Sequence, residues 1–165
     1  MERLWSPWRL AYVTSASGGN QACIFCHTDE PGREDLILIR GRVSYIVLNR
    51  YPYNNGHLMV APIRHVATLE ATHAEEREEL MRFTRHAEIA LTESYKPQGL
   101  NIGINLGRPA GAGVVDHLHV HVVPRWNGDT NFMTVIGEVR VLPEDLGATK
   151  RRLQPIFERL ARDSD

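Results

Sequence analysis

The spacing of hydrophobic residues changes along the chain, and this change separates predicted strands from a predicted helix. Short runs rich in β-branched and aromatic residues predict five strands, at 36–39, 43–48, 57–62, 100–105 and 117–123. Between the third and fourth runs, apolar residues recur every three or four positions, at Leu80, Phe83, Ala87 and Leu91. That stripe predicts an amphipathic helix over about 73–95.

The last part of the chain is expected to be helical from about Pro143. Pro155 lacks a backbone N–H group, so we expect it to end or kink that helix. Strands joined by turns, one long crossover helix and two more strands indicate an α+β domain. We divide it into an N-terminal arm over 1–34, a core over 35–126, and a C-terminal extension of the same domain over 127–165.

The composition narrows the function classes. The 19 Lys and Arg residues are balanced by 20 Asp and Glu, so the chain lacks the basic surface that a nucleic-acid duplex requires. No apolar run approaches the ~18–20 residues of a membrane span, and the first residues lack the apolar stretch of a secretory signal. The 2 cysteines are too few for a disulfide scaffold. We therefore expect a cytoplasmic protein that binds neither nucleic acid nor membrane.

Segment 116–124 has the most informative pattern. Polar and apolar residues alternate there with period two, which predicts a half-buried strand with His117, His119 and His121 on one face. Neighbouring histidines would lie about 6.5–7 Å apart, so two of them can chelate one metal ion but three on a straight strand cannot. Exposed polar residues on an amphipathic strand are the simpler interpretation. Three of the chain's 8 histidines at this spacing favour a functional site in which their roles differ.

The glycine-rich loop 105–113 leads toward that strand. Glycines let backbone amides turn toward a ligand, which would make the loop an anion-binding nest. Such loops are also common as plain connections between strands. Beside a histidine face, the loop would supply donors for phosphate oxygens while a neutral imidazole supplies a nucleophile.

The segment 117–123, His-Leu-His-Val-His-Val-Val, resembles the signature of the histidine triad (HIT) superfamily of nucleotide hydrolases and transferases. The resemblance extends over Leu-Asn-Arg at 48–50 and Gly-His-Leu-Met-Val at 56–60. The triad followed by Gly-Asp at 128–129 is similar to the fragile-histidine-triad branch. The opening Leu-Trp-Ser-Pro-Trp-Arg, with Cys-Ile-Phe-Cys at 23–26, is similar to bacterial diadenosine tetraphosphate phosphorylases.

This resemblance implies a fold and an activity. The HIT fold is an antiparallel sheet of about five strands with one long crossover helix and a C-terminal helix, and the sheet continues across a homodimer. The implied activity is cleavage of adenosine dinucleoside polyphosphates, such as diadenosine tetraphosphate, or related AMP esters. A histidine would attack the α-phosphorus and form an adenylyl-histidine, from which water or phosphate would take the AMP group. Hydrolysis of AMP-amidates, nucleotide binding without turnover, and a metallohydrolase using His117 and His119 are the alternatives.

The resemblance also implies individual roles within the core. His119 would be the nucleophile, and His121 would contact the phosphate and help to protonate the departing oxygen, since imidazole titrates near neutrality. Asn105 would touch the phosphate with its amide, and Asn49 would bind the ribose hydroxyls. His57 belongs to the Gly-His pair near the active site of the family.

One stretch departs from the family pattern. Many members have Gln-Ser or Gln-Thr just before the triad, where the hydroxyl touches phosphate. This sequence has Gly111, Ala112 and Gly113 there and no hydroxyl, so we expect backbone amides to bind the phosphate instead.

The two cysteines, in Cys23-Ile24-Phe25-Cys26-His27, have several interpretations. A c-type haem site normally requires export, and a thioredoxin-like redox site requires a strand-to-helix junction in a βαβ unit. Free thiols remain, as does zinc, which needs two more ligands for a closed tetrahedral site. The resemblance to zinc-bearing HIT proteins and to galactose-1-phosphate uridylyltransferases implies that His65 and His117 complete it. Such a structural zinc would tie the N-terminal arm to the histidine strand.

Overall fold

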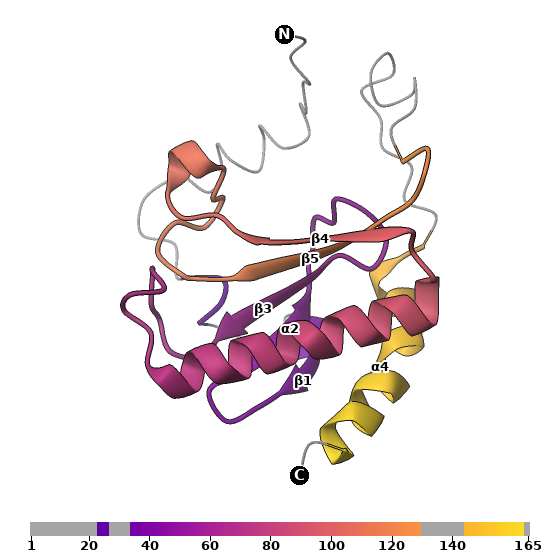
Figure 1. The fold of residues 1–165 in the computed structure, drawn as a ribbon, viewed down its shortest axis with the longest axis horizontal. Helices are drawn as coiled ribbons and strands as arrows, with labels where there is room; N and C mark the ends of the chain where they lie inside the picture. The colour runs from indigo at the N-terminus through magenta and orange to yellow at the C-terminus, as the bar shows by residue number, and fades with distance from the viewer. Residues whose placement is uncertain (1–22, 27–33, 130–143, 164–165) are drawn as a thin grey trace, which may run out of the picture.

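The computed structural model describes residues 23–26, 34–129 and 144–163. In these ranges five antiparallel strands form one sheet in the order β1-β2-β3-β5-β4, and two α-helices pack on one face (Figure 1). The strands are β1 Ile37–Arg40, β2 Ser44–Leu48, β3 Leu58–Pro62, β4 Gly99–Ile104 and β5 Val120–Arg125. The helices are α2 Ala74–Tyr95 and α4 Leu146–Arg162. The predicted α+β class, crossover helix and C-terminal helix are confirmed.

Helix α2 buries the stripe that its sequence predicts. Leu80, Phe83 and Leu91 are all buried in the core that α2 forms with β2, β3 and β5. The helix begins after His73, whose backbone N–H donates to the Glu76 carboxylate at 2.7 Å in a capping box. Burial of this apolar stripe stabilises the packing of the crossover helix on the sheet, because apolar burial is the main favourable term in folding.

Helix α4 does not end at Pro155, contrary to one of the two outcomes that the sequence predicts; it continues to Arg162. The proline removes one backbone donor at a cost of about 3 kcal/mol. On either side of it, Leu153 and Phe157 are fully buried in the core beside α2 and β1. Each such side chain contributes about 1.5–3 kcal/mol on burial. Tertiary packing therefore outweighs the local break.

Strand β5 begins at Val120, which corrects the predicted start at residue 117. His117 and His119 precede the regular strand. The physical reason lies on β3, where Pro62 has no N–H group with which to continue the ladder. Its carbonyl instead accepts a hydrogen bond from the His117 side chain, at 2.8 Å from Nε2.

Several expectations fall outside the described ranges. The arm predicted over 1–34 is described only at 23–26 and at Glu34, and the predicted start of the tail helix at Pro143 is also outside. The boundaries at 34/35 and 126/127 stay predictions. Among the described helices, none combines the length and the apolar character that crossing a membrane requires.

Candidate active site and metal centre

The chain around the start of β5 presents different chemistry to the two faces of the sheet. Leu118 and Val120 lie in the core under α2. His117 and His119 alternate with them, as predicted, and are only 1% and 4% exposed, while His121 is half-buried. The simpler interpretation, in which these histidines are exposed polar residues, is therefore wrong for His117 and His119. Buried polar groups need partners, and the partners define the site.

His119 is held in one tautomer. Its Nδ1 atom is 2.8 Å from the backbone oxygen of His117. A carbonyl oxygen only accepts, so Nδ1 has the ring proton and Nε2 keeps its lone pair. Burial lowers the pKa of His119, which favours the neutral imidazole at pH 7. A neutral imidazole with a lone pair on Nε2 is the form of histidine that acts as a nucleophile.

His121 is held in the opposite tautomer by hydrogen bonds that begin in the turn before β3. The backbone N–H of Tyr53 donates to Nδ1 of His57 at 3.0 Å, so the neutral His57 ring has its proton on Nε2. That Nε2 lies 3.0 Å from Nδ1 of His121 and donates to it, which places the His121 proton on Nε2. With ring centroids 4.8 Å apart, His119 offers a lone pair and His121 offers an N–H group.

The turn Cys23–Cys26 covers the histidines from the face opposite the helices. Phe25 in this turn is 3% exposed, and its ring stacks on the imidazole of His119 with centroids 4.7 Å apart and planes inclined by 30°. Tyr45 of β2 donates its hydroxyl to the backbone oxygen of Phe25 at 2.8 Å. Burial raises the pKa of Tyr45, so the hydroxyl retains the proton that it donates.

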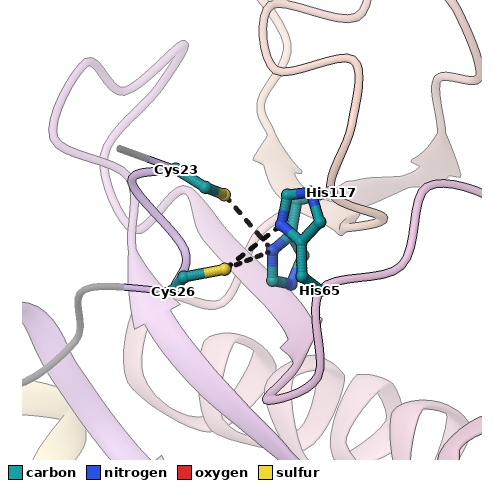
Figure 2. Close-up of side chains that lie close together, drawn as sticks. All are labelled: Cys23, Cys26, His65 and His117. Atoms are coloured by element: carbon teal, nitrogen blue, oxygen red, sulfur yellow. Dashed lines mark hydrogen bonds between the residues drawn. The ribbon is translucent and has the colours of Figure 1, made fainter. Parts of the chain in front are cut away.

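The four predicted metal ligands, two from this turn and two from elsewhere in the chain, lie close together. The ligand atoms of Cys23, Cys26, His65 and His117 all lie within 4.8 Å of one another, and their side chains point toward a common space (Figure 2). Sγ of Cys23 is 3.3 Å from Nδ1 of His117, and Sγ of Cys26 is 3.2 Å from Nδ1 of His65. Nitrogen and sulfur ligands at ~2.0 and ~2.3 Å on the corners of a tetrahedron are ~3.5 Å apart, so this spacing fits one zinc ion.

The orientation of His117 also fits a metal ligand. Its Nε2 donates to the carbonyl of Pro62, so Nδ1, which faces the cysteines, keeps its lone pair. Burial and the neighbouring Cys23 raise the pKa of Cys26 to about 11. Cysteines bind metals as thiolates, and two neighbouring thiolates repel each other. A divalent cation at this point would offset that repulsion and favour deprotonation of both cysteines.

Comparison with known proteins places this geometry in a family. A family model described as the HIT domain matches residues 31–128. The chain belongs to the HIT family. A relative from Mycobacterium tuberculosis, named AP-4-A phosphorylase, is 44% identical over 161 aligned positions, and the match covers 93% of this chain and 83% of that protein.

Two solved structures share the HIT fold with this chain. A zinc-bound histidine triad family protein from Mycobacterium smegmatis superposes with a TM-score of 0.63 and 25% identity, over 93% of this chain and 96% of that one. A hypothetical histidine triad nucleotide-binding protein from Sulfolobus tokodaii gives a TM-score of 0.65 and 25% identity, over 86% and 93%. The HIT fold implied by the sequence resemblance is confirmed.

In the glycine-rich loop, two of the three backbone N–H groups predicted to bind phosphate instead form hydrogen bonds within the loop. The N–H of Gly111 donates to the Arg108 carbonyl at 2.9 Å, and that of Ala112 donates to the Gly107 carbonyl at 3.2 Å. Gly107 and Gly111 have φ angles of 81° and 91°, which glycine adopts without strain. Among the three predicted amides, and within the part of the chain that the structure describes, only the N–H of Gly113 does not donate to a carbonyl of the loop. Phosphate binding by this loop stays a prediction.

The two asparagines with predicted roles have different surroundings. Asn49 accepts from the Tyr51 N–H at 2.9 Å and places its amide nitrogen 3.2 Å from Nδ1 of His57, next to the paired histidines. Asn105 lies 3.5 Å from the Gly111 carbonyl, across the glycine-rich loop. Their contacts to ribose and to phosphate stay predictions.

Sequence reasoning missed the aromatic residues of this HIT site. Phe25 contacts His119, and Tyr53 both donates to His57 and lies with its ring 4.5 Å from the His57 ring. Tyr45 braces Phe25 from β2. No periodicity marks these positions. The one signal in the sequence is the aromatic residue between the two cysteines, which a metal-binding turn does not itself require.

Proposed function

We propose that this chain is a nucleotide phosphorylase or hydrolase that cleaves adenosine dinucleoside polyphosphates, such as diadenosine tetraphosphate, at the α-phosphate. The opposed tautomers of His119 and His121 support the proposal, because they place a nucleophilic lone pair beside an N–H donor. The Mycobacterium tuberculosis relative, at 44% identity and named AP-4-A phosphorylase, favours phosphate over water as the acceptor.

The reaction proceeds in two displacements. Nε2 of His119 attacks the α-phosphorus and forms an N–P bond while the P–O bond to the departing polyphosphate breaks. The Nε2–H of His121 donates to the departing oxygen. The positive charge of the adenylylated imidazole is stabilised through its Nδ1–H by the carbonyl of His117, at 2.8 Å. Inorganic phosphate then attacks the α-phosphorus and breaks the N–P bond, giving ADP and restoring neutral His119; water in its place gives AMP.

A row of apolar side chains beside His121 offers a place for the nucleoside. Met59 of β3 pairs with His121, Val47 of β2 pairs with Met59, and Ile37 of β1 pairs with Val47. Residues paired across antiparallel strands share a face, so this row lies on the histidine side of the sheet. Met59 is buried in the cluster that contains Phe25, and Val47 and Ile37 are partly buried against it. Their exposed parts offer apolar contact for a purine base, and Asn49 lies two residues beyond Val47 for the ribose hydroxyls.

The cluster of Cys23, Cys26, His65 and His117 is proposed to hold a structural zinc ion. The donor set and its spacing support this, as does the zinc-bound relative from Mycobacterium smegmatis. Bound zinc would supply a cross-link between the turn 23–26 and the residues before β5. Protein purified without chelator should contain about one zinc per chain by metal analysis, and Cys23→Ser should lose it. Only a few tenths of a zinc per chain, unchanged in Cys23→Ser, would contradict the site.

Chelation separates this structural role from metal catalysis. A closed site should release zinc slowly and together with unfolding. Immediate loss of activity from protein that stays folded would favour a metallohydrolase using His117 and His119. Circular dichroism recorded beside the activity during chelation distinguishes the two.

The deciding experiment is product analysis. Diadenosine tetraphosphate is incubated with the protein, with and without inorganic phosphate, and the nucleotides are separated by anion exchange. ADP and ATP formed only with phosphate identify a phosphorylase, whereas AMP and ATP without phosphate identify a hydrolase. No turnover in either case contradicts both, and AMP-amidates as substrates and AMP binding are then tested as the alternatives.

We propose that the chain forms a homodimer located in the cytoplasm. Strand β4 lies at the edge of the sheet, and Asn101, Ile102 and Gly103 within it are exposed, so a second copy can extend the sheet there. We expect a homodimer of two 18.7 kDa chains in light scattering, and a shift to monomer in Ile102→Lys. A monomeric wild-type protein would contradict it. The protein is expected in the cytoplasmic fraction of its cells.

A further inference from the structure

We propose that Phe25 is a positioning residue for His119: its ring, seated on the imidazole, holds the nucleophilic nitrogen in the direction of the α-phosphorus. The proposal rests on the proposed function in one respect, that His119 is the nucleophile. Its geometric content, the orientation of the His119 ring by Phe25, is independent of the substrate.

The hydrogen bond of His119 does not by itself fix the plane of the ring. A single Nδ1–H···O bond to the His117 carbonyl leaves the imidazole free to tilt about that bond, and terminal ring torsions have broad minima. Two ring contacts restrict the tilt. Phe25 stacks on the imidazole at 4.7 Å and 30°, and His121 meets it nearly edge-on at 4.8 Å and 78°.

Phe25 is itself held by the sheet. The Tyr45 hydroxyl bonds its carbonyl at 2.8 Å, and Tyr45 is a buried residue of β2, two strands away from β5. The turn is closed by the Cys26 N–H, which donates to the Cys23 carbonyl at 3.0 Å. These two bonds hold the backbone of Phe25 independently of His119, which a support for a nucleophile requires.

The surroundings of Phe25 argue against a role in the main core. Its apolar neighbours form a small cluster on the histidine face, with Tyr45, Met59 and Ala61 as the other buried members. The large core lies on the other face, under the helices. Within the described residues, Phe83 of that core is also near a histidine, with its ring 5.8 Å from His86 and inclined by 36°. Phe83 is therefore a matched control: an equally buried phenylalanine beside a histidine that has no proposed role.

The test compares Phe25→Leu with Phe83→Leu. Leucine keeps an apolar side chain but removes the flat face. In Phe25→Leu, the single-turnover rate of adenylyl-enzyme formation from diadenosine tetraphosphate, followed by the ATP released after an alkaline quench, should fall about tenfold or more, because small misplacements of reacting groups cost large factors in rate. The Kd for AMP should stay within about twofold, and zinc content should not change. Phe83→Leu should keep the wild-type rate, and Phe25→Tyr, which retains the ring, should recover most of it.

A second readout does not depend on turnover. Nitrogen-15 NMR of the imidazoles at one fixed pH should show His119 as a single, sharp Nδ1–H tautomer in the wild type. In Phe25→Leu the same tautomer should give an exchange-broadened signal, because the tilting ring keeps its bond to the His117 carbonyl. Phe83→Leu should leave the His119 signal unchanged.

Three outcomes overturn the proposal. The first is a rate in Phe25→Leu within twofold of wild type. The second is an equal fall in Phe83→Leu or a loss of zinc in Phe25→Leu, because either would mean a merely structural role. The third is a His119 signal in Phe25→Leu that is as sharp as in the wild type. If the wild type forms no adenylyl-histidine, the proposed function fails, and the NMR comparison alone decides the role of Phe25.

Discussion

The two faces of the sheet are ordered in different ways. Under α2 and α4, a continuous apolar core holds each side chain by contact with many neighbours. The histidine face has a small apolar cluster and is ordered by single directed contacts, such as Tyr45 to Phe25 and His57 to His121. Apolar burial contributes free energy in proportion to area, whereas one hydrogen bond contributes little net free energy but fixes a direction. Stability and chemistry are therefore separable in this protein, by face.

Removing the nucleophile is the sharpest way to break this comparison. His119→Ala should lower the turnover of diadenosine tetraphosphate by at least about a thousandfold, because the N–P bond can no longer form. The free energy of unfolding should change by only about 1–2 kcal/mol, since one hydrogen bond and one ring are lost. Turnover and urea unfolding measured on the same preparation check both. A folded variant that keeps more than about a tenth of wild-type turnover would show that another group does the chemistry.

The helix face should give the converse result. Phe157→Ala removes a fully buried ring of α4 from the core and should cost about 3–5 kcal/mol in the free energy of unfolding. The turnover of the folded fraction, measured well below the melting temperature, should stay within about twofold. Leu69→Ala, at a 41% exposed position, is the control and should change stability by about 0.5 kcal/mol or less. A large fall in kcat for Phe157→Ala would mean that the two faces are coupled.

The smallest expected effect sharpens the comparison through pH. Arg64 beside Glu76, together with the His73 N–H, holds the pKa of that buried carboxyl below its usual value. The carboxylate therefore adds stability above about pH 4.3, the ordinary glutamate pKa, and this contribution is lost as pH falls through the lower folded value. Glu76→Gln should lower the free energy of unfolding at pH 7 by about 1 kcal/mol, since the guanidinium is solvent-screened. The difference from wild type should shrink steadily in urea titrations below pH 4.3; a constant difference would contradict it.

The sequence predicts best the parts of the fold that depend on local spacing. The apolar stripe of α2 lies where the period indicates, and the alternation of histidines with core residues before and in β5 is confirmed. The errors have non-local causes. The start of β5 depends on Pro62, far earlier in the chain, and the continuation of α4 through Pro155 depends on packing against other elements.

The candidate site shows the same division. The triad signature identifies His119 and His121 as site residues. Their tautomers depend on a backbone carbonyl and on His57 in the turn before β3, which the signature does not show. Spacing identifies the two cysteines, and family resemblance is needed to add His65 from another segment. Phe25 lies within the cysteine motif, yet its contact with His119 exists only once the turn folds onto the sheet.

His117 joins three neighbours that are far apart in the sequence. Nδ1 faces the cysteines, Nε2 donates to the Pro62 carbonyl, and the backbone oxygen accepts a hydrogen bond from Nδ1–H of His119. We expect position 117 to tolerate few substitutions during evolution. A side chain that can bind metal at the position of Nδ1 does not also donate to the Pro62 carbonyl as Nε2 does. In a library of all single substitutions selected for activity, variants at position 117 should be depleted as strongly as variants of His119.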